Sequence, residues 1–166
     1  MLLVVGVAAL AAGCGVPTPA APTANEVLAK PQQSDLKDAH FTVTGKITDN
    51  GTTVDLVGDG ALAYKPKLAG RFKFTTNVGG QEVTIQEISL DGTNYGLTPA
   101  SPKWMANATA KDKDGNAFDA YVREKDGYPI KYVETQTGGQ NITLTFDKYN
   151  TGETITAPPA DQVQQG

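Results

Sequence analysis

The sequence of 166 residues has few of the residue types on which reactive or cross-linked sites depend. It contains one cysteine, Cys14, one histidine, His40, and one tryptophan, Trp104. A single cysteine excludes an intramolecular disulfide and any CxxC redox or zinc motif. Basic residues are also sparse, with 14 Lys and Arg against 18 Asp and Glu, a formal net charge of −4, and they are scattered singly. This balance argues against nucleic acid as a partner and against a polybasic membrane patch.

Catalytic signatures are missing as well. No G-x-S-x-G nucleophile motif occurs, and His40 is expected at the surface because its strand phase is opposite to that of Phe41. The stretch Gly58-Asp59-Gly60-Ala61-Leu62-Ala63 has the spacing of a nucleotide fingerprint but lies inside a strand pattern, with Tyr64-Lys65-Pro66 where a helix would have to begin. We therefore expect no enzyme activity and no cofactor.

One stretch has the spacing of a calcium loop. Asp112, Asp114 and Asn116 place oxygen ligands at every second residue, but Ala117 and Arg123 stand where an EF-hand requires Gly and Glu. An Asp- and Gly-rich turn before a strand explains the stretch better. We therefore reject this weak calcium candidate and expect no metal site.

The N-terminus is apolar over residues 2–12. Eleven residues make about 16 Å of helix, which is too short for a bilayer of about 30 Å but fits the apolar region of a secretory signal. The ending Ala11-Ala12-Gly13-Cys14 resembles the lipobox of bacterial lipoproteins, although Ala11 stands at the usual Leu position and no Lys or Arg precedes the apolar run. The alternative is an ordinary signal peptide with an incidental cysteine.

The lipobox resemblance implies a specific processing and location. Residues 1–13 would be a removed signal peptide, and Cys14 would be the lipid attachment site, carrying a diacylglyceryl thioether and a fatty acyl group such as palmitate. The protein would be anchored in the bacterial cell membrane, facing the envelope outside the cytoplasm. Residues 14–25 would form the lipidated cysteine and a proline-rich tether that extends up to roughly 30 Å.

The body of the chain predicts a mainly β (α+β) domain over residues 26–160, followed by a tail at 161–166. Its helical region is 26–39, where Pro31 favours either two short turns or a helix that starts at about Ser34 as N-cap. From Phe41 onward the apolar period is two, with Gly-rich hairpin turns between short strands. We expect about eight or nine antiparallel strands in meander order, forming a curved sheet or open half-barrel with a short N-terminal helix.

Three local irregularities are expected in this sheet. Gly58 and Gly60 should bend their strand or admit a close neighbour. A bulge near Gln86-Glu87 would bring Val83 and Ile85 into phase with Ile88 and Leu90. Residues 98–118 should form a long loop.

Several phrases of the sequence resemble one lipoprotein family. They are Ala39-His40-Phe41-Thr42-Val43, Ile88-Ser89-Leu90-Asp91-Gly92-Thr93-Asn94-Tyr95, Lys103-Trp104, Asp126-Gly127-Tyr128-Pro129-Ile130, Thr143-Leu144-Thr145-Phe146 and Ile155-Thr156-Ala157-Pro158-Pro159. These look like the LppX/LprG-type (LppX_LprAFG) bacterial lipoproteins, relatives of the LolA/LolB lipoprotein carriers. The resemblance implies an open half-barrel that holds acyl chains on its concave face. Fewer residues separate Lys103-Trp104 from the next predicted strand than in the family, so a shallow or merely packed half-barrel without a lid is the alternative to a deep cavity.

The strand phase provides candidates for such a lipid cavity. Trp104 and Met105, expected in the loop, could cap its open side. The same residues could equally form a plain core. The predicted lining residues are Phe41, Val43, Leu56, Phe72, Phe74, Ile85, Leu97, Trp104, Tyr132, Leu144 and Phe146.

Two functions follow from these expectations. The first is a membrane-anchored envelope lipoprotein that binds or carries an acylated lipid or glycolipid, without chemistry. The alternative is an envelope lipoprotein without a lipid ligand, acting as an accessory or protein-interaction module whose partner protein is unidentified.

Overall fold

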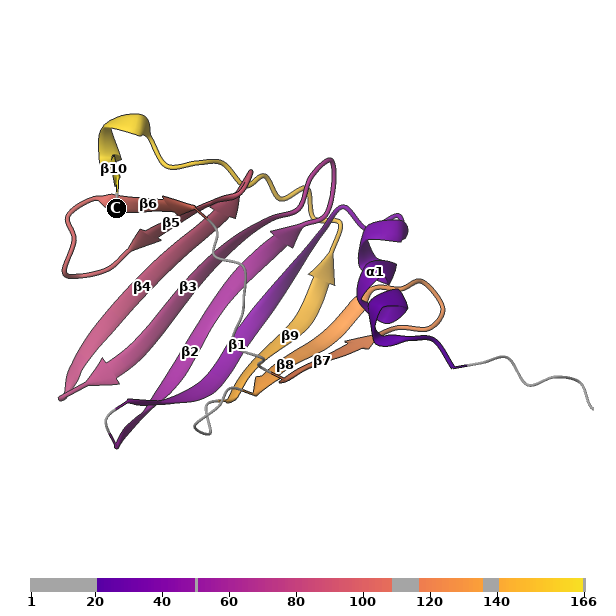
Figure 1. The fold of residues 1–166 in the computed structure, drawn as a ribbon, viewed down its shortest axis with the longest axis horizontal. Helices are drawn as coiled ribbons and strands as arrows, with labels where there is room; N and C mark the ends of the chain where they lie inside the picture. The colour runs from indigo at the N-terminus through magenta and orange to yellow at the C-terminus, as the bar shows by residue number, and fades with distance from the viewer. Residues whose placement is uncertain (1–20, 50, 109–116, 136–140, 166) are drawn as a thin grey trace, which may run out of the picture.

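The computed structural model describes residues 21–49, 51–108, 117–135 and 141–165 (Figure 1). Within these ranges one α-helix precedes ten strands, and all ten strands belong to a single open sheet. This confirms the predicted class of a mainly β protein with a short N-terminal helix. The elements are α1 (Ala24–Gln33), β1 (Asp38–Asp49), β2 (Thr52–Ala63), β3 (Ala69–Val78), β4 (Gln81–Leu90), β5 (Thr93–Leu97), β6 (Trp104–Ala108), β7 (Ala117–Val122), β8 (Pro129–Thr135), β9 (Asn141–Tyr149), the 3₁₀ turn η1 (Ala160–Gln162) and β10 (Val163–Gln165).

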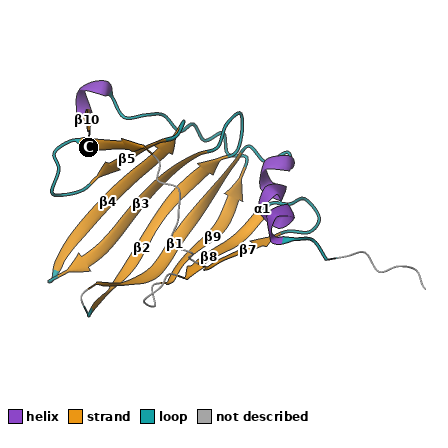
Figure 2. Ribbon diagram, in the orientation of Figure 1, coloured by secondary structure: helices purple, strands orange, loops and turns teal. Residues whose placement is uncertain are grey.

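The sheet consists of two meanders joined side by side. Its strand order is β10-β6-β5-β4-β3-β2-β1-β9-β8-β7. Strands β1 to β6 form one antiparallel run and β7 to β9 form another, and the antiparallel pair β1–β9 connects them. The predicted meander order therefore holds within each run. It is wrong between β6 and β7, which lie toward opposite edges of the sheet (Figure 2).

The hairpin turns follow the predicted glycine signals. Asp91 and Gly92, between β4 and β5, both have positive φ, +50° and +77°. That conformation matches the right-handed twist of the flanking strands and favours Asp-Gly. The Gly79-Gly80 turn between β3 and β4 likewise has positive φ at both residues.

Strand β4 contains no bulge, contrary to the sequence prediction. Its pairing with β3 runs without interruption from Ala69↔Leu90 to Val78↔Gln81. Ile85 and Ile88 therefore lie on opposite faces of the sheet. The prediction of a bulge rests on a sheet with one solvated face. Both faces are in fact partly covered here, since the C-terminal segment passes beside Leu90.

Helix α1 begins earlier than predicted, with Thr23 and not Ser34 as its N-cap. Thr23 caps it: its Oγ1 accepts from the Glu26 N–H at 3.3 Å, and the Thr23 N–H donates to Glu26 Oε2 at 2.7 Å, a complete capping box. Pro31 lies within the last turn, where its missing N–H removes one helical bond at most. Ser34, expected as the N-cap, is instead the C-cap. Helix α1 packs against β7 near one end of the sheet (Figure 1).

Two strands occupy segments predicted to be irregular. Strand β6 lies within the expected loop at 98–118, and β10 lies within the expected tail at 161–166. Strand β10 pairs in parallel with β6 from Val163↔Trp104 to Gln165↔Ala106. A parallel pair between segments so distant in sequence has no local turn signal that could reveal it.

Candidate functional site

The two faces of the sheet are defined by the strand registers, because directly opposite residues share a face. Phe41 on β1 lies opposite Gly60 on β2 and Phe146 on β9, and Gly60 lies opposite Phe72 on β3. We call the face that bears Phe41 the front face, and the other the back face. The front face brings together nine predicted lining residues, Phe41, Val43, Leu56, Phe72, Phe74, Ile85, Tyr132, Leu144 and Phe146.

Leu97 and Trp104 do not join this group. Leu97 lies opposite Gln86, which lies opposite Lys73 on the back face. Trp104 precedes Met105, whose partner Gly96 is on the front face, so Trp104 also lies on the back. The expected cap of Trp104 and Met105 is thus divided between the faces. Met105 remains in front, where Gln164 Nε2 donates to its sulfur at 2.7 Å.

An unbroken row of aromatic rings crosses the front face. Adjacent ring centroids are 4.9 Å apart for Tyr132–Phe146, 5.5 Å for Phe146–Phe41, 5.4 Å for Phe41–Phe72 and 5.9 Å for Phe72–Phe74. These separations lie in the range of favourable ring contacts. The row links β8, β9, β1 and β3 and gives the face a continuous apolar floor.

The row passes over β2 because β2 contributes glycine at this point. A Cβ atom built on Gly60 would lie 2.3 Å from Cζ of Phe41 and 2.4 Å from the carbonyl oxygen of Arg71. The Phe41 ring therefore occupies the space that a side chain at position 60 would need. The predicted close neighbour at Gly60 is confirmed, and it is Phe41.

The front face is closed at one end and partly open at the other. Near α1, the buried residues Leu36, Tyr64 and Tyr128 complete a core with Phe41 and other front-face residues. Around this core, and as far as Ile47 toward the β1–β2 hairpin, further apolar side chains of the front face are only partly buried. These partly buried residues include Ile47, Phe72, Phe74, Tyr132, Ile142 and Leu144. Further binding of apolar material there would remove more surface from water.

Glu87 is a front-face residue that the sequence interpretation missed. It lies opposite Phe72 on β3 and Gly96 on β5. Burial raises the pKa of its carboxyl group. Among the residues that the structure describes, Glu87 has no hydrogen-bond or ion-pair partner. Strict alternation through β4 would have placed it here, but the expected bulge hid that signal.

Tyr64 carries another polar group within the front-face core. Tyr64 is 7% exposed. Burial, together with the neighbouring Tyr132, raises the pKa of the Tyr64 phenol strongly. The group is therefore neutral over the whole physiological range and adds no charge to the front face.

The back face is crossed by the C-terminal segment, which two carboxylates hold in place. Buried Asp38 accepts hydrogen bonds from the Thr151 N–H at 2.8 Å, the Thr151 hydroxyl at 2.7 Å and the Gly152 N–H at 3.0 Å. Burial raises the pKa of Asp38, but these bonds outweigh it, so that the net pKa is lowered. Glu153 then contacts Arg71 Nε at 2.5 Å and His40 Nε2 at 3.1 Å.

These contacts define the state of Glu153 and the position of His40. The hydrogen bond from Arg71 lowers the pKa of Glu153, so its carboxylate is charged at neutral pH. His40, which the sequence placed at the surface, has a side chain that is 27% exposed and lies between β1 and this segment. Its geometry is that of a structural contact, not of a base beside a nucleophile.

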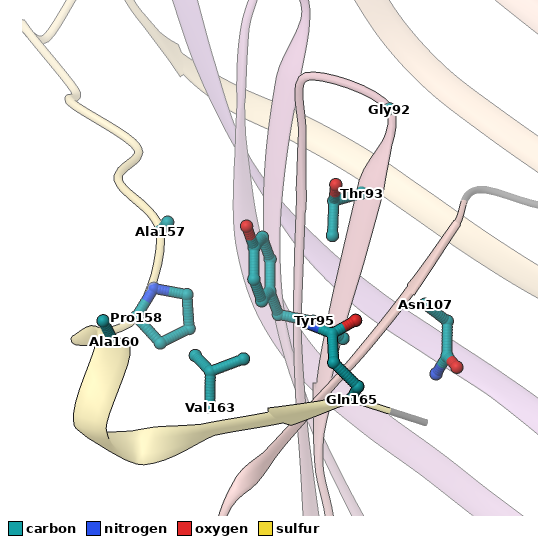
Figure 3. A pocket seen from close by; sticks show the side chains of 10 residues that line it. Gly92, Thr93, Tyr95, Asn107, Ala157, Pro158, Ala160, Val163 and Gln165 are labelled. Atoms are coloured by element: carbon teal, nitrogen blue, oxygen red, sulfur yellow. The ribbon is translucent and has the colours of Figure 1, made fainter.

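A hollow of about 550 Å³ lies where the C-terminal segment returns to the sheet (Figure 3). The Tyr95 ring stands between Thr93 and the chain at Ala157 and Pro158 (Figure 3). The described side chains that line the hollow are uncharged, so they offer no counter-ion for a charged ligand. They belong to Gly92, Thr93, Tyr95, Ala106, Asn107, Ala157, Pro158, Ala160, Val163 and Gln165.

Several predicted residues lie outside the described ranges. These are Cys14, with the signal peptide and most of the tether, and the rejected calcium candidates Asp112, Asp114 and Asn116. Within the described part of the chain, no group of three or more His, Cys, Asp or Glu side chains is arranged to hold a metal ion. In the same part, no helix has the length and apolar character needed to span a membrane.

Comparison with known proteins supports the fold alone. No protein-family model matches the chain, and no curated protein matches it. Among solved structures, it is similar to the crystal structure of an uncharacterized conserved protein from Thermus thermophilus, with a TM-score of 0.53 and 11% identity. The match covers 86% of this chain and 99% of that one. The sheet architecture is therefore shared with a protein whose description gives no function.

Proposed function

We propose that this protein is a lipid-anchored lipoprotein of the bacterial cell envelope that binds the acyl chains of a lipid on the front face of its sheet. The observation that carries the proposal is the aromatic row from Tyr132 to Phe74, which continues into apolar side chains that are only partly buried. The anchor rests on the lipobox resemblance at Cys14 and the lipid class on the resemblance to LppX/LprG-type proteins.

The mechanism requires only burial of apolar surface. Each acyl methylene that leaves water contributes about 0.8 kcal/mol. An acyl chain that lies along the partly open end would contact Ile47, Phe74 and Leu144, which share the front face. Binding of this kind is reversible, and the proposed anchor keeps the protein beside the membrane that supplies the lipid.

Native mass spectrometry tests the proposal on protein produced from Gly15 onward, without the acyl anchor. This form keeps α1 and all ten described strands, because all of these elements lie within residues 24–165. We expect copurifying lipid, or uptake of the neutral apolar dye N-phenyl-1-naphthylamine. If neither occurs, the lipid ligand is refuted and an accessory or protein-interaction module is favoured.

A matched pair of variants on β4 locates the binding site. Ile85 is on the front face, while its neighbour Thr84 is on the back, opposite Thr75. Ile85→Gln places an amide on the apolar floor and should weaken dye binding at least about fivefold, because a polar group is then buried without a partner. Thr84→Gln should leave binding unchanged. Equal effects of the two substitutions would place the ligand elsewhere.

A further inference from the structure

The charges of the sheet are divided unequally between its faces. The registers place the lysines and arginines of the described strands on the back face, including Lys46, Arg71, Lys73, Lys131 and Lys148. On the front face, the charged residues of these strands are acidic and include Glu87 and Glu134. Among the described strand residues, a ligand on the front face therefore faces acidic and no basic side chains.

Arg123 is a cation at the closed end of the front face. It lies over the rings of Tyr128 and Tyr149, at 4.8 and 4.9 Å from their centroids. Its guanidinium is paired with Asp126, with Nη2 3.1 Å from Oδ2. Since this charge is already compensated and stacked, it offers little attraction to an anionic ligand at the open end.

In the part of the chain that the structure describes, space is left beside the Glu87 carboxylate. Gly96 is its direct partner on β5, and a Cβ atom built on Gly96 would meet no atom of the described residues within 4 Å. On the β3 side, Glu87 lies directly opposite Phe72. A small polar group can therefore approach from the β5 side while an attached hydrocarbon chain follows Phe72 and Phe74.

We propose that Glu87 makes the front face selective for amphiphiles whose head group donates a hydrogen bond and carries no negative charge. The inference rests on the proposed function and specifies its ligand class. An ionised carboxylate has acceptors only, so it gains from a hydroxyl or ammonium donor and repels an anion. A bound donor in turn favours the charged form of Glu87 against the burial that raises its pKa. Partial desolvation strengthens both effects, because charges interact more strongly away from water.

Competition between probes of equal chain length tests this selectivity. Dodecylammonium, monolauroylglycerol and dodecyl sulfonate, each below its micelle concentration, displace N-phenyl-1-naphthylamine from the protein produced from Gly15 onward. We expect the ammonium and glycerol probes to bind about tenfold more tightly than the sulfonate. The affinities for dodecylammonium and for monolauroylglycerol, compared with each other, show whether a cationic or a hydroxyl-bearing head group is preferred.

Three variants connect the preference to Glu87. Glu87→Gln should reduce the preference to about twofold, while Glu87→Asp, which keeps the charge, should preserve most of it. Glu82→Gln removes the same charge from the back face of the same strand and is the matched control, since Glu82 lies opposite Asn77. Circular dichroism establishes that each variant is folded.

The outcomes separate the selectivity from the function. If the wild-type protein binds all three probes equally, or favours the sulfonate, the selectivity is overturned and lipid binding stands. If Glu82→Gln acts as strongly as Glu87→Gln, net charge and not Glu87 sets the preference, and the proposal again fails. If neither the dye nor any probe binds, the proposed function fails and the selectivity with it.

Discussion

The contact between Phe41 and Gly60 predicts an energetic coupling that a double-mutant cycle can measure. Gly60→Ala would place its Cβ against two neighbours, the Phe41 ring and the Arg71 carbonyl oxygen. Phe41→Leu removes the ring atoms Cζ and Cε2, which lie 2.3 and 2.7 Å from that Cβ. The Leu substitution therefore relieves one of the two clashes and leaves the backbone clash in place.

The magnitudes follow from overpacking and from the buried state of Phe41, which is 2% exposed. Gly60→Ala should destabilise the protein by about 2–3 kcal/mol, and Phe41→Leu by about 1 kcal/mol. The double variant should be more stable than the sum of these losses by about 1 kcal/mol, the part of the overpacking that the ring imposes.

Gly58→Ala provides the control for this cycle. A Cβ on Gly58 would clash with the Lys73 carbonyl oxygen at 2.2 Å, and its other near contacts are also backbone atoms, not Phe41. Combined with Phe41→Leu, it should therefore be additive within about 0.4 kcal/mol. Urea unfolding followed by far-UV circular dichroism gives all the free energies of unfolding. Additivity at Gly60, or equal coupling at Gly58, would refute this account of the packing.

Three further predictions concern other parts of the chain. Asp38→Asn should cost about 2–3 kcal/mol, because an amide donor then faces the Thr151 and Gly152 donors in a buried site; urea unfolding that shows no loss would contradict this. The pKa of Asp38 is lower in the folded state than its unfolded-state pKa of about 3.9. The ionised Asp38 therefore contributes to the free energy of unfolding above about pH 4, and this contribution is lost as the pH falls through the folded-state pKa. Below about pH 4, the stability of the wild-type protein should consequently fall more steeply than that of Asp38→Asn. Thr23→Ala should reduce stability by about 1 kcal/mol through loss of the α1 cap, and unchanged hydrogen-exchange protection of the α1 amides would contradict it. Metabolic labelling with an alkyne fatty acid should mark the wild-type protein and not Cys14→Ser, and labelling of both would exclude Cys14 as the attachment site.

The sequence was most informative where local chemistry determines structure. Asp91-Gly92 and Gly79-Gly80 require positive φ, so their turns could be placed from residue types alone. The alternation around Phe41 and Val43 likewise predicted which side chains share a face. From these signals followed the β class, the hairpins and nine front-face residues.

The errors arose where distant segments determine the outcome. The β6–β10 pair joins the middle of the chain to its end, and three residues of β10 carry no periodic signal of their own. Because the back face is covered, β4 pairs with β3 without a bulge. The uninterrupted register places Glu87 on the front face and Leu97 on the back face. The early start of α1 was different, because the Thr23-to-Glu26 spacing was visible as a capping box.

The junction of the two meanders has a consequence for when the protein can fold. Strand β1 obtains its second partner only from β9, and Asp38 bonds Thr151 across 113 residues of chain. The front-face core, which includes Phe41 and Phe146, is therefore incomplete until the last part of the polypeptide is available. Such long-range closure slows folding. For a chain that crosses a membrane unfolded, as the proposed lipoprotein does, this topology delays folding until translocation is nearly finished.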